Sequence, residues 1–197
     1  TLVDDNIGRV LEALKQRGIE KDTLIMFTND HGELLGDHGL LFKGPFHYDC
    51  IIKAPMIIKW PGVVPQGSRY SQITEHTDIM PTLLEYAGVR PPYGVQGCSM
   101  APILRGDKGA GKEYAMTEFN CYDWGLSVKT LTGRDYKLTC YAGEEFGELY
   151  DRNRDPEEFK NLWNDEAYRD VKVRMMKKLM DRMIETEDPL PLRIGKY

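Results

Sequence analysis

An aspartate and a histidine follow a short apolar run near the start of the chain, and a lysine comes twelve residues after the histidine. The run Thr23–Thr28 leads through Asn29 into Asp30 and His31, and the lysine is Lys43. A carboxylate binds hard cations through oxygen, and an imidazole adds a nitrogen ligand. An ammonium is a compact charge suited to the oxygens of a sulfate or phosphate. These residue types predict a divalent-metal site that handles an anionic ester.

The same residues also have an ordinary structural interpretation. Asp30 could cap the turn that it forms with His31 and Gly32, because short polar side chains bond nearby backbone groups. Lys43 could be a solvated loop lysine. Two ligands and a lysine hold no divalent cation tightly, and they supply no nucleophile for covalent catalysis. On the residues alone, the metal site and the structural turn both stay open.

Two further histidines lie close to this motif. His38 belongs to a loop whose glycines, Gly36 and Gly39, allow the backbone to fold back tightly. It is a candidate general acid or substrate contact, and equally a loop residue bonded to backbone. His47 is a weaker candidate of the same kind. We assign His38 to substrate binding as a hypothesis.

The elements that must position the motif follow an α/β order. Apolar residues between Val3 and Leu14 fall on one helical face, and Gly18 is a typical residue for the end of such a helix. The continuous apolar run 24–28 is typical of a strand buried in a sheet covered on both faces. A second run, Pro55–Trp60, ends at a Pro-Gly turn. The order of helix, turn and buried strand predicts an α/β fold.

A third helix and a long connection follow. Thr77 and Asp78 can cap a helix that runs to Ala87, with Gly88 just past its end. Residues 89–112 are rich in Gly and Pro, so we expect a long surface connection and a domain boundary there. The predicted units are 1–110 and 111–197.

Beyond residue 112 the apolar period changes to two, which predicts antiparallel strands. They are expected at 114–118, 125–131, 136–141 and 148–150, with a hairpin turn at 132–135. A long amphipathic helix is expected from Ala167 to Ile184, and its methionines are typical core filler. The second unit is therefore predicted to be a small antiparallel sheet packed on a long helix.

Composition limits the class of protein. The chain has 197 residues, of which 41% are hydrophobic and 29% charged, and a formal charge of −5. These values are typical of a globular protein, and the absence of a basic stripe argues against nucleic-acid binding. No apolar stretch is long enough for a transmembrane helix. The chain opens at Thr1, inside an expected helix, so we expect a truncated or processed chain.

The cysteines give a weaker signal. They are widely spaced, without a C-x-x-C pair, so a structural zinc site is not expected. Free thiols are the simpler interpretation, and a disulfide stays open. The cysteines are Cys50, Cys98, Cys121 and Cys140.

Taken in order, these segments resemble the sulfatase family of the alkaline phosphatase superfamily. The resemblance implies that the first unit is the remnant of an α/β/α sandwich with a mixed sheet. It spans nearly the whole chain. The matching segments are 27–33, 35–39, Lys43, 54–62, 77–84, 87–88, 96–99, 136–138, 148–151, 155–158 and 161–162.

The resemblance also implies roles for the candidate residues. Asp30 and His31 match the family's second pair of metal ligands, with Ca2+ the expected cation and Mn2+, Mg2+ or Zn2+ the alternatives. Lys43 matches the lysine that contacts the sulfate near the bridging ester oxygen, where it would stabilise charge on the leaving group. The implied substrate is a sulfated small molecule or a sulfated sugar. A periplasmic or secreted location is favoured, as for many bacterial sulfatases.

The family's nucleophile is missing from this chain. Family members use a Cys or Ser in a C-x-P-x-R-like motif, modified to formylglycine, and no Cys or Ser here has Pro two residues later. Asp4 and Asp5 are a false match to the family's first aspartate pair, since they lie on the polar side of the first helix. We therefore expect the C-terminal part of a sulfatase, inactive alone, with formylglycine in the missing part.

Two other functions stay open. One is a phosphodiester or phosphonate monoester hydrolase of the same superfamily, because imidazole suits manganese or zinc more than calcium. The other is a non-catalytic binding or structural module. In either case, truncation is expected to expose a strand edge and apolar surface and to favour self-association.

Overall fold

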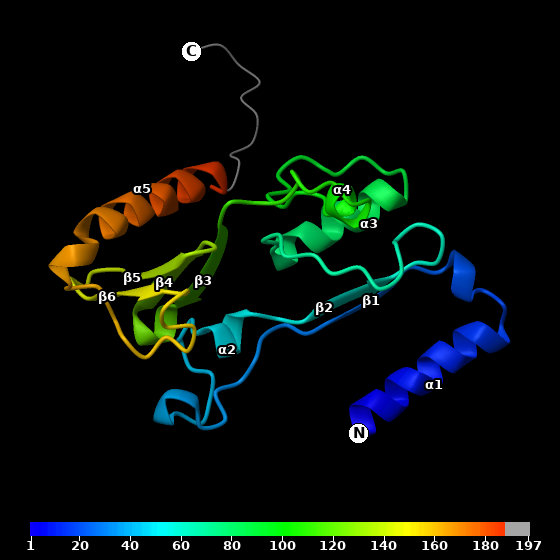
Figure 1. The fold of residues 1–197 in the computed structure, drawn as a ribbon, viewed down its shortest axis with the longest axis horizontal. Coiled ribbons are helices and arrows are strands. Elements are labelled where there is room, and N and C mark those ends of the chain that lie inside the picture. The colour runs from blue at the N-terminus through cyan, green and yellow to red at the C-terminus, as the bar shows by residue number, and fades with distance from the viewer. Residues whose placement is uncertain (188–197) are drawn as a thin grey trace, which may run out of the picture.

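Two antiparallel sheets organise the chain in the computed structural model, which describes residues 1–187 (Figure 1). The helices are α1 (Leu2–Gln16), α2 (Asp49–Ile52), α3 (Ile79–Tyr86), α4 (Ala101–Leu104) and α5 (Arg169–Glu185). The strands are β1 (Ile25–Thr28), β2 (Met56–Lys59), β3 (Ala115–Cys121), β4 (Leu126–Thr132), β5 (Tyr136–Tyr141) and β6 (Gly147–Asp151). The predicted α/β class and the order of elements are confirmed. Residues 188–197 of the predicted second unit lie outside the described residues.

The first sheet is a two-stranded ribbon of β1 and β2. The strands are antiparallel, and Phe27 lies opposite Ile57. Sequence analysis placed β1 in a sheet covered on both faces, but Phe27 is 38% and Ile57 63% exposed. That expectation of burial was wrong for this chain, because among residues 1–187 no other strand pairs with the ribbon.

The helix α3 is tied to the rest of the chain by Asp78. Its side chain was expected to cap the helix, but it makes no capping bond to α3. Instead the buried carboxylate accepts hydrogen bonds from the backbone N–H groups of Glu75 and Cys98, each at 2.8 Å. The adjacent Gly97 must be glycine, since a Cβ there would lie 1.9 Å from the carbonyl oxygen of Thr77. The bond from Glu75 is part of a capping box at the helical turn His76–Asp78, which leads directly into α3. Asp78 therefore caps this turn and also holds the neighbouring loop through Cys98.

The expectation of a surface connection over 89–112 was wrong in part. The short helix α4 lies within it, and Ala101, Ile103 and Leu104 are buried. The backbone N–H of Met100 donates to Oγ1 of Thr82 at 2.8 Å, which ties α4 to α3. The short apolar run therefore adds to the core of the first unit.

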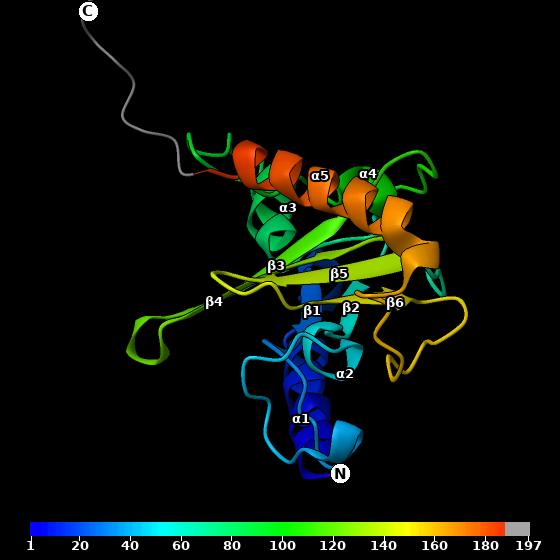
Figure 2. The same cartoon turned by 90° about the vertical axis from the view of Figure 1, so that its left-hand side faces the viewer.

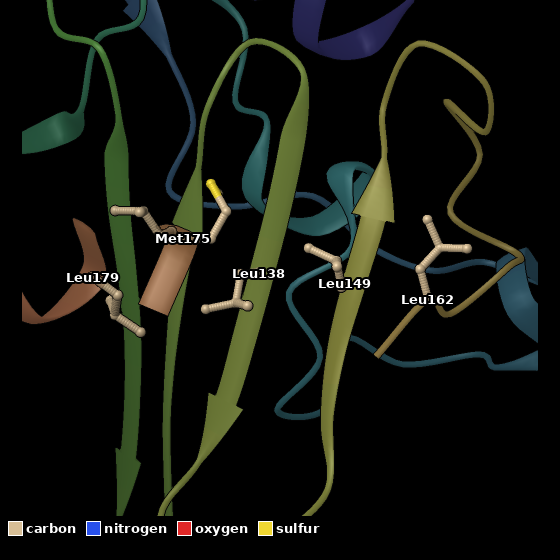
Figure 3. Close-up of a cluster of buried hydrophobic side chains, with 6 residues drawn as sticks. Leu138, Leu149, Leu162, Met175 and Leu179 are labelled. Atoms are coloured by element: carbon tan, nitrogen blue, oxygen red, sulfur yellow. The ribbon is translucent and has the colours of Figure 1, made fainter. Parts of the chain in front are cut away.

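The second sheet has the strand order β3-β4-β5-β6, with every pair antiparallel. Its apolar face packs on α5, as predicted. Leu131, Leu138 and Leu149 pair across the strands and are fully buried. Met175 and Leu179 project from α5 onto this face (Figure 3). Since burying one such side chain contributes roughly 1.5–3 kcal/mol, this cluster holds the helix to the sheet.

The opposite face of this sheet is polar and also buried. Thr130 pairs with Thr139, Thr139 with Glu148, and Lys137 with Tyr150. Figure 2 shows α5 above the sheet and α2, with the chain leading to it, below. Strand alternation thus places apolar residues toward α5 and polar residues toward α2.

Candidate active site

The candidate residues lie directly after β1. The backbone N–H of His31 donates to Oδ1 of Asp30 at 3.0 Å, and Oδ2 of Asp30 lies 3.4 Å from Nε2 of His31. Nδ2 of Asn29 donates to the carbonyl of His31 at 3.1 Å. The backbone hydrogen bond from His31 lowers the pKa of Asp30, and the nearby charge of Lys43 acts in the same direction. Asp30 is therefore held as a carboxylate next to an imidazole.

The ring of His31 is fixed in one tautomer by its two contacts. Nδ1 lies 2.7 Å from the carbonyl oxygen of Gly32, so this nitrogen carries the proton and donates. Nε2 is then an acceptor, and Nζ of Lys43 lies 2.6 Å from it. A backbone carbonyl on Nδ1 is a common way to present Nε2 to a metal. The structure therefore brings together Asp30, His31 and Lys43, as predicted.

Gly32 anchors this turn on α2. Its N–H donates to the carbonyl of Ile51 at 2.7 Å. A Cβ at this position would lie 1.8 Å from the carbonyl oxygen of Cys50, which no side chain tolerates. The glycine after Asp30 and His31 therefore serves close backbone packing.

Asp30 and His31 fit part of a metal site. Their side chains are 85% and 35% exposed, and two donor atoms face the same space. Residues 1–187 contain no group of three or more His, Cys, Asp or Glu side chains placed to hold a metal. A cation held here would need further ligands from outside the described residues. In the described part of the chain, Cys50, Cys98 and the other two cysteines form no disulfide.

His38 lies in a different environment. Its ring stacks on Tyr48, with centroids 3.7 Å apart and planes at 8°, and Phe159 lies 4.9 Å away. Its φ of 52° completes a tight turn that begins at Gly36. These contacts are those of a packed loop residue, and the assignment of His38 to substrate binding stays a prediction.

His47, the weaker candidate, is buried against the second sheet. Its Nδ1 lies 2.8 Å from Oγ1 of Thr130. Burial lowers the pKa of His47 to about 4, and the charge of Lys137 adds to the shift. His47 is therefore neutral and held in the interface between loop and sheet.

Sequence reasoning missed a buried lysine behind the site. Lys137 lies on β5 with 1% of its side chain exposed, and its Nζ donates to Asp49 Oδ1 at 2.7 Å. The available signal was strand alternation, which placed Lys137 and Thr139 on a face opposite Leu138. A polar sheet face that is buried needs polar partners.

No helix within residues 1–187 combines the length and the apolar character needed to cross a membrane.

The order of elements, with a long helix covering an antiparallel sheet, is that of the C-terminal domain of sulfatases of known structure. The chain belongs to the family described as N-sulphoglucosamine sulphohydrolase, C-terminal, which matches residues 36–185. The sulfatase resemblance is thereby confirmed.

The sequence relatives are longer than this chain. It is 33% identical over 192 residues to N-acetylglucosamine-6-O-sulfatase of Bacteroides thetaiotaomicron, covering 94% of this chain and 34% of that protein. It is 35% identical over 191 residues to the uncharacterized sulfatase YidJ of Escherichia coli, covering 95% of this chain and 37% of that protein. The chain thus spans little more than a third of these relatives.

Solved structures agree on the fold. BT4656, in complex with its substrate D-glucosamine-2-N,6-O-disulfate, matches with a TM-score of 0.88 and 30% identity, covering 98% of this chain and 40% of that chain. The phosphonate monoester hydrolase of Agrobacterium radiobacter matches with a TM-score of 0.86 and 31% identity, covering 94% of this chain and 40% of that chain. The relatives therefore include both sulfate-ester and phosphonate-ester hydrolases.

Proposed function

We propose that this chain is the C-terminal part of a sulfuric ester hydrolase and forms one wall of its active site. The observation that carries the proposal is the fixed tautomer of His31, whose Nε2 lies 2.6 Å from Nζ of Lys43 and 3.4 Å from Oδ2 of Asp30. A carboxylate, an imidazole nitrogen and an ammonium then face one space. This combination suits a cation and an oxyanion bound side by side.

Asp30 and His31 would hold the divalent cation, together with ligands from the part of the protein that precedes this chain. The bound cation would neutralise the negative oxygens of the ester. The resemblance favours Ca2+, whereas the imidazole ligand favours Mn2+ or Zn2+, and Mg2+ is a further alternative. Hydrogen bonds from Asn29 and to Gly32 hold His31, and the backbone N–H of His31 holds Asp30, before any cation binds.

Lys43 would act on the ester itself. Its ammonium would lie beside the bridging oxygen, where negative charge develops as the S–O bond breaks, and a positive charge placed there lowers the barrier. The nucleophile, a formylglycine in this class, would come from the preceding part. The chain alone is therefore proposed to be inactive.

The proposed substrate is a sulfated sugar. Support comes from BT4656, whose solved structure holds a disulfated glucosamine, and from the N-acetylglucosamine-6-O-sulfatase relative. The second candidate is a phosphonate monoester, supported by the structural likeness to phosphonate monoester hydrolases. Export to the periplasm or the exterior is a further proposal, to be checked by cell fractionation of the complete protein.

The complete protein tests this proposal. Purified enzyme containing this chain is assayed with glucosamine 6-sulfate, an aryl sulfate and an aryl phosphonate monoester, with and without prior chelation. We expect sulfate release to exceed phosphonate hydrolysis and to fall after chelation. Preferential phosphonate hydrolysis would favour the second candidate. No hydrolysis of any ester would favour a non-catalytic module.

A further inference from the structure

A buried ion network joins the second sheet to the segment that carries the candidate site. Nζ of Lys137 donates to Oδ1 of Asp49 at 2.7 Å and to the carbonyl of His47 at 3.0 Å, and it contacts Oε1 of Glu158. The ammonium thus makes two hydrogen bonds and one further ion-pair contact, to the Glu158 carboxylate. The lysine is therefore paired with two carboxylates although it is buried.

Glu158 and Arg152 bind the same aspartate, Asp49. Oε2 of Glu158 accepts from the backbone N–H of Asp49 at 2.8 Å. Nη2 of Arg152 donates to Oδ2 of Asp49 at 2.7 Å, and Nη1 donates to the carbonyl of Gly133 at 2.7 Å. Asp49 is the first residue of α2 and is held from three directions.

The charges in this network are strongly coupled. Burial alone would raise the pKa of Asp49, but the charges of Lys137 and Arg152 and their hydrogen bonds lower it overall. Burial raises the pKa of Glu158 more than Lys137 lowers it. Removing one member leaves a buried charge without its partner, which destabilises the folded chain.

Only one short helix separates this network from the turn of Asp30, His31 and Gly32, which is called the metal-binding turn below because the proposed function places the cation there. Asp49 is the first residue of α2. In the same helix, the carbonyl of Ile51 accepts the 2.7 Å hydrogen bond from the Gly32 N–H, and the carbonyl of Cys50 packs closely against Gly32. Gly32 in turn accepts from Nδ1 of His31. The path from Lys137 to His31 is therefore a chain of direct contacts.

We propose that Lys137 is a positioning residue: with Asp49 and Glu158, it fixes α2 and thereby sets the placement of His31 and Asp30. The statement that His31 is a metal ligand rests on the proposed function. The statement that Lys137 positions His31 through α2 does not, because it concerns contacts within this chain. Either statement can therefore fail without the other.

A second buried lysine provides a matched control. Lys112 also bridges an aspartate and a glutamate, with its Nζ 2.6 Å from Oδ1 of Asp78 and in contact with Glu75, and its side chain is 12% exposed. Its network ties α3 to β3 and to Arg182 of α5. Its partners Glu75 and Asp78 belong neither to α2 nor to the turn at Gly32. Loss of either lysine should lower global stability, but only one should loosen the metal-binding turn.

The experiment measures amide hydrogen exchange of the 197-residue chain by NMR, for the wild type, Lys137→Met and Lys112→Met. Global stability of each variant is measured by urea unfolding, so that local opening is separated from global unfolding. We expect the Gly32 amide, relative to amides that exchange by global unfolding, to exchange about tenfold faster in Lys137→Met. In Lys112→Met that ratio should stay at the wild-type value.

Equal acceleration of Gly32 in both variants, or none in either, would overturn the proposal. If Lys137→Met does not fold, Asp49→Asn decides the question, because it keeps a side chain of the same size and weakens the same ion pair. An unchanged relative Gly32 rate in Asp49→Asn would then overturn it. None of these outcomes depends on ester hydrolysis, so an inactive complete protein leaves the test intact.

Discussion

Nζ of Lys43 lies 2.6 Å from Nε2 of His31, while Nδ1 of the same ring donates to the carbonyl of Gly32. The lysine therefore occupies the lone pair that a cation would use. A bound cation would displace the ammonium by like-charge repulsion and turn it toward an anionic ester. One contact thus links the proposed cation site to the proposed ester site.

Replacing Lys43 with alanine should lower kcat of the complete protein by about 10²–10³-fold, because a charge aimed at the developing oxyanion is lost. Lys21→Ala removes an exposed lysine from a distant turn and serves as the control. Steady-state rates of sulfate release measure both variants. A Lys43→Ala enzyme with the rate of the control would remove Lys43 from the chemistry.

Gly32→Ala should destabilise the chain by at least about 1–3 kcal/mol, the typical range for overpacking, because its Cβ would collide with the carbonyl of Cys50. Gly8→Ala is the matched control. Gly8 lies within α1 with no atom within 4 Å of an added Cβ, so alanine should stabilise by roughly 0.5–1 kcal/mol.

Urea unfolding of both glycine variants provides the free energies of unfolding. Opposite signs of the two changes are expected. If Gly32→Ala unfolds at the wild-type urea concentration, the close packing of the turn on α2 is not a constraint in solution.

The sequence predicted those elements whose stability comes from local pattern. The period of two predicted β3 to β6, and helical spacing predicted α1 and α5, because each pattern marks one apolar face of an element. The helix α5 buries that face against the sheet, whereas α1 has no buried residue. The predicted burial of β1 failed for the same reason, since an apolar run does not tell which elements will cover it within residues 1–187.

The candidate residues could be selected from the sequence, but the contacts that hold them could not. The strand-end motif predicts Asp30 and His31 as metal ligands and Lys43 as a contact to the ester. The contact between Lys137 and Asp49 joins residues far apart in the sequence, and no local pattern encodes such a pair. His38 shows the converse, because its motif suggested chemistry and its neighbours are the aromatic rings of Tyr48 and Phe159.

His47 should make the chain less stable as the pH falls. Its pKa is about 4 in the folded chain against 6.5 as the reference value, so between these values the unfolded chain binds a proton that the folded chain excludes. Stability is then highest above pH 6.5 and is lost progressively toward pH 4, by up to about 3 kcal/mol from this residue.

The measurement is urea unfolding at several pH values for His47→Asn and His76→Asn. Asparagine at position 47 can still bond Thr130 but does not titrate. His76 is exposed and serves as the control. His76→Asn should still lose stability between pH 6.5 and 4 as the wild type does. His47→Asn should lose less stability over the same range, because the contribution of His47 is absent. Parallel stability profiles for the two variants would show that His47 does not carry it.

The isolated chain should self-associate through the exposed face of the β1–β2 ribbon. Phe27 and Ile57 are paired across the strands and both are exposed, and an open two-stranded ribbon also presents unpaired backbone groups at its edges. Ile57→Lys should lower the average mass in sedimentation experiments at equal concentration. Val173→Lys, on the outer side of α5 with 59% exposure, is the control and should leave the mass unchanged. A wild-type chain that stays monomeric at every concentration tested would mean that this apolar pair, though exposed, is too small to drive association.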